Sequence, residues 1–110
     1  MTVRLVDPPL NDTEKLLAEV LKVILQPDGR VLFLCESGHG PRIVQRLRVA
    51  ISRTRNKLAE KNVRSQKFRL RATFHPETHD GKRLQACVLW RQVTDSNLML
   101  QDLEGLMAHG

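Results

Sequence analysis

The 110-residue sequence predicts a small α+β domain, in which two or three helices pack on one face of an antiparallel sheet of about three strands. Two observations predict this class. Apolar residues recur at spacings of three and four over 16–24 and over 41–61, and they alternate with polar residues along both arms of 66–92. With a short apolar run at 31–35 and a last helical pattern, the predicted order is helix, strand, helix, strand, strand, helix.

Length and composition favour one domain spanning 1–110, with residues 1–10 as an extended N-terminal segment. Hydrophobic residues make up 41% of the chain, which is enough for a packed core. No apolar run approaches the roughly 20 residues that cross a bilayer, and the N-terminus lacks the apolar centre of a signal peptide. We therefore expect a cytoplasmic protein without a membrane segment, in which Cys35 and Cys87 are buried reduced thiols.

The first helix is predicted to follow Asn11, because Asn11 and Glu14 have the spacing of a capping box. Its apolar stripe runs to Ile24, and the turn-forming sequence 27–29 ends it. The next run, 31–35, is rich in strand-forming residues and apolar on both sides, which is typical of a buried strand.

The second helix is predicted over 41–61, because Pro41 suits a first helical turn and no Gly or Pro follows it in this range. At 100° per residue, one side of this helix is apolar, and Arg48 and Arg55 flank the apolar stripe. The opposite side is almost wholly cationic and carries Arg42, Arg46, Arg53 and Lys57.

A hairpin is predicted over 66–92, with the loop 76–81 ending in the turn signal Asp80-Gly81. On the first strand the apolar residues from Phe68 to Phe74 alternate with basic ones. On the return strand we assign Leu84, Ala86, Val88 and Trp90 to the core side. Matching these apolar faces would gather five basic residues on the other face of the hairpin: Lys67, Arg69, Arg71, Arg83 and Arg91.

A last short helix is predicted from about Asp95, with only acidic charged side chains. One conflict remains in this arrangement, because the strand 31–35 is apolar on both faces whereas the second face of the hairpin is basic. Either an apolar island forms there, or a second copy of the chain covers it and makes a homodimer.

The distribution of charge carries the functional prediction. Residues 42–71 hold eleven basic side chains, eight of them Arg, and a single acid, Glu60. A face with so few acids is typical of proteins that bind a polyanion, and Arg grips phosphates through its planar fork. We expect a small nucleic-acid-binding protein that contacts the phosphate backbone through the helix 41–61 and the basic face of the hairpin 66–92.

The predicted contacts form two rows. The helix supplies Arg42, Arg46, Arg53 and Lys57, and the hairpin supplies Lys67, Arg69, Arg71, Arg83 and Arg91. Because every aromatic residue is assigned to the core side, duplex DNA or structured RNA is favoured over single strands, which usually stack on exposed rings. The sequence does not distinguish DNA from RNA.

Other functions are weighed against this one. The alternative is a non-enzymatic assembly or inhibitory protein whose Arg-rich face docks on an acidic protein partner. The loop 37–40 precedes a helix N-terminus and could contact a phosphate, although a plain turn explains its glycines. The spacing of Cys35, His39, His75 and His79 is weak support for a metal site. We expect no enzyme, no catalytic residues, no metal and no cofactor.

Overall fold

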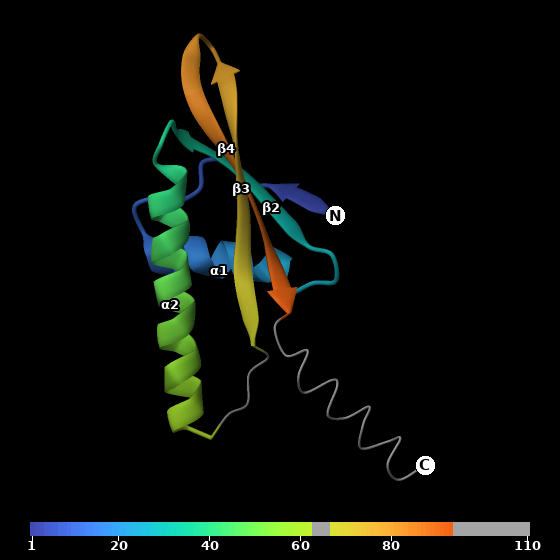
Figure 1. The fold of residues 1–110 in the computed structure, drawn as a ribbon, viewed down its shortest axis with the longest axis vertical. Helices are drawn as coiled ribbons and strands as arrows, with labels where there is room; N and C mark the ends of the chain where they lie inside the picture. The colour runs from blue at the N-terminus through green and yellow to red at the C-terminus, as the bar shows by residue number, and fades with distance from the viewer. Residues whose placement is uncertain (63–66, 94–110) are drawn as a thin grey trace.

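The computed structural model describes residues 1–62 and 67–93, which form two helices and a four-stranded mixed sheet (Figure 1). The α+β class is confirmed. The strand order across the sheet is β1-β2-β4-β3, with β1 parallel to β2 and the other neighbours antiparallel. In chain order the elements are β1 (Thr2–Arg4), α1 (Thr13–Ile24), β2 (Arg30–Glu36), α2 (Gly40–Glu60), β3 (Phe68–His79) and β4 (Lys82–Val93).

The element order departs from the prediction at the N-terminus. Residues 2–4 are not merely extended but form β1, which adds a parallel edge strand beside β2 and makes the sheet mixed. A three-residue strand is too short for alternation to reveal it. The predicted last helix from about Asp95 lies outside the described residues.

The helices begin and end close to where their patterns predict. The N-cap of α1 is Asp12 rather than Asn11, because the Asp12 carboxylate accepts a hydrogen bond from the backbone N–H of Lys15. The long basic helix starts at Gly40, with Pro41 in its first turn. Both helices pack on one face of the sheet, as predicted. This covered face contributes Val31, Phe33 and Leu89 to the core, and each of these side chains is fully buried.

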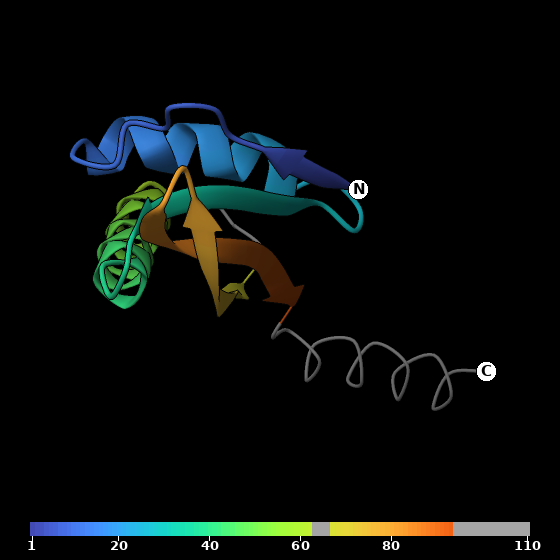
Figure 2. The same ribbon diagram turned by 90° about the horizontal axis from the view of Figure 1, so that it is seen from above.

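The hairpin is longer than predicted. Its turn consists of Asp80 and Gly81 alone, and both have positive φ, which matches the twist of the flanking strands. The segment 76–79, expected as a loop, is the end of β3. Pro76 is tolerated there because β3 is an edge strand. The sheet is strongly twisted, and in Figure 2 the direction of β3 crosses that of β2.

The pairing of β3 with β4 corrects the predicted hairpin faces. His79 pairs with Lys82, Phe74 with Cys87 and Arg71 with Trp90. Paired residues of antiparallel strands point to the same face, so the covered face takes the odd-numbered residues of β4 and not the even-numbered ones. The predicted core-side set Leu84, Ala86, Val88 and Trp90 lies instead on the opposite face, on which neither α1 nor α2 packs and which we call the open face.

At the start of α2, the backbone of Gly40 lies directly against side chains of β3 and β4 on the covered face. The Gly40 N–H donates to the side-chain oxygen of Gln85 at 2.9 Å. A methyl group at Gly40 would lie 2.8 Å from the sulfur of Cys87 and 2.8 Å from a ring carbon of Phe74. Only glycine lets the helix start at this distance, which aligns α2 along the edge of β3.

Candidate nucleic-acid interface

The four cationic residues predicted on α2 form an exposed ridge, Arg42, Arg46, Arg53 and Lys57. Three of them, Arg46, Arg53 and Lys57, line a groove of about 740 Å³ between α1 and α2. Within the described residues none of the four pairs with a carboxylate. Arg46 is partly committed to the fold, since its guanidinium donates to the carbonyl oxygen of Leu10 at 2.8 Å.

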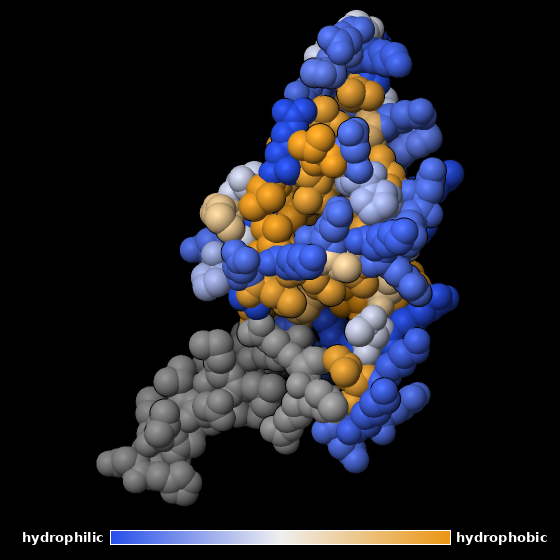
Figure 3. Space-filling view, turned by 180° about the vertical axis from the view of Figure 1, so that it is seen from behind, coloured by the Kyte–Doolittle hydropathy of each residue, from blue (hydrophilic) through white to orange (hydrophobic). Residues whose placement is uncertain are grey.

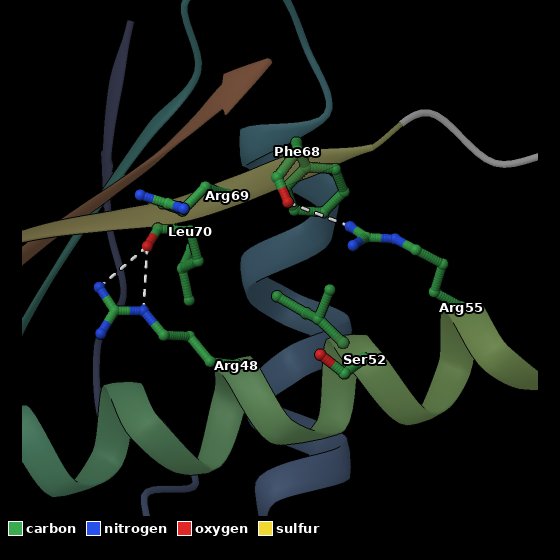
Figure 4. Close-up of a pocket in the computed structure, with 7 residues that line it drawn as sticks. Arg48, Ser52, Arg55, Phe68, Arg69 and Leu70 are labelled. Atoms are coloured by element: carbon green, nitrogen blue, oxygen red, sulfur yellow. Dashed lines mark hydrogen bonds between the residues drawn. The ribbon is translucent and has the colours of Figure 1, made fainter. Parts of the chain in front are cut away.

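The other flank of α2 carries two arginines that bind the free edge of β3. Nε and Nη2 of Arg48 donate to the carbonyl oxygen of Leu70 at 3.1 and 3.0 Å (Figure 4). Arg55 donates to the carbonyl oxygen of Phe68 at 3.1 Å, and its guanidinium carbon lies 5.4 Å from the centre of the Phe68 ring. These contacts satisfy carbonyls on the side of β3 that faces away from β4, its one neighbour among the described strands, and so protect an edge against pairing with another chain.

A cleft of about 320 Å³ opens where α2 meets β3. Its lining includes Arg48, Ser52 and Arg55 from the helix and Arg69 from the strand, above the apolar floor made by Ile51 and Leu70 (Figure 4). No carboxylate belongs to this lining, and in the described part of the chain none pairs with its three arginines.

The arginines of the cleft have more N–H donors than their hydrogen bonds to β3 use. A guanidinium has five N–H donors, and the bonds to β3 use two on Arg48 and one on Arg55. Arg69 is exposed and adds a further fork. Three uncompensated guanidinium groups beside a serine hydroxyl make a site suited to a phosphate oxygen.

The five basic hairpin residues do not share one face, contrary to the prediction. Lys67, Arg69 and Arg71 alternate along one side of the first arm, and Arg69 and Arg71 belong to the open face. Arg91 pairs with Leu70 on the covered face, and Arg83 pairs with Thr78 on that same side near the hairpin turn. The expected row is therefore divided, because the face assignment of the return strand was wrong by one residue.

Arg48 and Arg55 connect the two basic surfaces. The ridge opens onto the groove beside α1, whereas Arg69 and Arg71 lie on the open face, so the predicted rows point in different directions. On the β3 side of the helix, however, Arg48 and Arg55 line the same cleft as Arg69. Helical periodicity places these two arginines beside the apolar stripe, and that position is the signal that identifies them.

The open face also presents an aromatic residue that the sequence prediction assigned to the core. Trp90 is partly exposed, and the guanidinium carbon of Arg30 lies 5.2 Å from the centre of its ring. The expectation that all aromatic rings point inward is wrong for Trp90. Phe33 is buried, while Phe68 and Phe74 pack partly against the core.

The remaining candidate positions show simpler roles. The Gly40 N–H at the start of α2 already binds Gln85, so the loop 37–40 offers one donor fewer to an anion. His39 and His79 each lie near an adjacent carboxylate, Glu36 and Asp80. No group of three potential metal ligands occurs among residues 1–62 and 67–93.

Neither α1 nor α2 combines the length and the apolar content of a membrane-spanning helix. Comparisons with protein-family models, with curated proteins and with solved structures give no match, so the residues themselves carry the functional argument.

Proposed function

We propose that the protein binds nucleic acid through its phosphate backbone. The cleft between α2 and β3 carries the proposal, because it brings together arginines from the two basic elements of the chain with no carboxylate among them. Arg48, Arg55 and Arg69 would hold one phosphate, and the exposed ridge on α2 would hold others. Duplex DNA or structured RNA fits contacts of this kind, which read the backbone and not the base edges.

The strength of binding should depend steeply on salt. Each phosphate contact releases a condensed counterion, so six to ten contacts lower the affinity about 10³- to 10⁵-fold between 50 and 200 mM salt. The experiment measures binding of labelled duplex DNA, single-stranded DNA and RNA to the full chain by fluorescence anisotropy at both salt concentrations. An affinity that is absent or unchanged by salt for all three would contradict the proposal.

The cleft is tested by Arg69→Glu, because Arg69 is exposed and its side chain makes none of the hydrogen bonds that hold β3 to α2. We expect about a tenfold loss of affinity and a salt slope lower by about 1. Lys22→Glu is the matched control, since it makes the same charge change at an exposed position of α1 outside the basic segment. Equal losses in the two variants would mean that only net charge matters and that the cleft holds no phosphate.

The alternative partner is an acidic protein surface, which the same arginines would also attract. It is distinguished by the same measurements, since it predicts no binding to any of the three nucleic acids. The wild-type chain should then capture an acidic protein from cell extract. That capture should be lost at high salt, and it should also be lost when the Arg69→Glu variant replaces the wild type.

A further inference from the structure

The open face of the sheet has an apolar centre. Its side chains come from the two middle strands and comprise Leu32, Leu34, Leu84, Val88 and Trp90. All five are partly exposed, and none belongs to the core cluster or to the apolar residues packed against it. Figure 3, which views the molecule from the side on which α1 lies, shows apolar surface between hydrophilic side chains below the hairpin tip. Neighbouring apolar side chains such as the five on the open face are typical of an interaction surface.

The two ends of the open face carry opposite charges. At one end Arg30 and Arg71 flank Trp90, because both are paired with it in the register of the sheet. At the other end the same register places Glu36 and Glu77 on either side of β4. None of these four charged residues forms an ion pair with another described residue, apart from the contact of Glu36 with the nearby His39.

This distribution is self-complementary. The same number of residues separates Arg30 from Glu36 on β2 as separates Arg71 from Glu77 on β3, and the midpoints of both spans pair with Cys87 of β4. A half-turn about an axis that crosses the strands at this point exchanges each arginine position with the glutamate position on the same strand. A second copy placed face to face in this way brings opposite charges together at both ends.

We propose that the open face binds a second copy of the chain, with the strands of the two copies antiparallel. Arg30 then meets the partner's Glu36, Arg71 meets the partner's Glu77, and Trp90 covers the partner's Leu84. Because the interface is isologous, each of these contacts occurs twice. Sheets stacked in this manner bury the apolar centre of both copies.

The charges favour a second copy over nucleic acid on this face. A nucleic acid strand running along it would pass the two glutamates at one end, which repel phosphate. The dimer also leaves the cleft between α2 and β3 free. Arg48 and Arg55 lie on the helix side of the edge strand, and Arg69, although it is on the open face, lies beyond the span Arg71–Glu77 that faces the second copy. Arg71 then belongs to the dimer interface and Arg69 to the phosphate cleft, so the two proposals can fail separately.

Charge reversal tests the pairing. The first variant combines Arg30→Glu with Arg71→Glu, and the second combines Glu36→Arg with Glu77→Arg. We expect sedimentation equilibrium to find the wild-type chain as a dimer and each variant with a dimer dissociation constant at least about 100-fold higher, because like charges then face one another. An equimolar mixture of the two variants should form a heterodimer in which all four pairs are restored.

Trp90 offers a second measurement, since it is the only tryptophan and the chain has no tyrosine. Its emission in the wild-type protein should shift to the red on dilution as the dimer separates and the ring becomes hydrated. If the circular dichroism spectrum of a variant shows that it does not fold, the emission of the wild-type protein still tests whether the chain forms the dimer. A monomeric wild type with emission independent of concentration, or reversed variants that stay dimeric, would overturn the proposal. So would folded variants that remain monomeric when mixed.

Discussion

The two faces of the sheet are built from alternate residues of the same strands, yet they differ in almost every physical respect. On the covered face Val31, Phe33 and Leu89 are fully buried beneath the helices. On the open face the intervening residues Leu32 and Val88 are only partly buried. The covered face carries apolar side chains along most of its length, whereas the open face ends in arginines on one side and glutamates on the other.

The comparison explains why the run 31–35 is apolar on both sides. One set of its side chains completes the core, and the other forms the centre of the open face. Apolar residues on a strand therefore do not identify the core by themselves, because the second face can be reserved for a partner. Substitutions at neighbouring positions of β2 should separate the two roles.

The largest effect is expected from Phe33→Ala compared with Leu32→Ala. Phe33 is fully buried in the core, so its truncation should cost about 3–5 kcal/mol of unfolding free energy. Leu32 loses only partial burial, which corresponds to about 1 kcal/mol. Urea denaturation followed by circular dichroism at low protein concentration measures both.

Similar costs for the two truncations would remove the distinction between the faces. Such a result would mean that Leu32 is covered in the folded monomer. A loss at Leu32 that grows with protein concentration would instead point to the dimer interface.

The elements with strong periodicity could be predicted from the sequence. The helical spacing of α1 and α2 and the alternation of β3 each extend over many residues. A single residue that does not fit the pattern therefore does not change the predicted helix or strand. Strand β1 could not be found in this way, because Thr2–Arg4 is too short and forms only by pairing with β2. The pairing of β3 with β4 also decides which basic residues share a face, since it places Arg69 and Arg71 on the open face and Arg91 on the covered face.

The register of β4 was predictable, although the apolar pattern pointed to the wrong choice. In the segment 84–90 all four even-numbered residues are apolar, whereas Gln85 interrupts the odd-numbered set, so counting apolar residues favours the register that is wrong by one residue. The turn decides between them. A two-residue turn at Asp80 and Gly81 pairs His79 with Lys82, and so matches even-numbered residues of β3 with odd-numbered residues of β4. Turn length carried the information that moves Trp90 to the open face.

A second substitution tests how closely the covered face holds α2. Gly40→Ala places a methyl group 2.5 Å from the side-chain oxygen of Gln85 and 2.8 Å from the sulfur of Cys87. Alanine favours a helix, but overpacking at this contact should dominate and destabilise the protein by about 1–3 kcal/mol. Thermal denaturation measures the loss.

Asn56→Ala is the matched control for Gly40→Ala, because it also introduces alanine into α2 but at an exposed position. Its effect should stay within about 0.5 kcal/mol. A Gly40→Ala variant as stable as this control would show that the start of α2 can move away from the sheet without loss.

The smallest effect concerns the thiols beneath the helices. The sulfur atoms of Cys35 and Cys87 lie 3.6 Å apart, and burial raises the pKa of both thiols, most strongly that of Cys87. The folded protein therefore keeps Cys87 protonated at a pH where the unfolded chain ionises it, from about 8.5 upward. The corresponding stability is fully present below that pH and is lost as the pH rises, by about 1.4 kcal/mol per unit.

Cys87→Ala isolates this contribution, because it removes the titrating group and retains a small apolar side chain on the covered face. Between pH 8 and pH 9.5, with a reductant present, the wild type should lose about 1 kcal/mol more unfolding free energy than the variant. Urea midpoints at the two pH values measure the difference. Equal losses would mean that Cys87 ionises as readily in the folded chain as in the unfolded one, which requires water to reach the covered face.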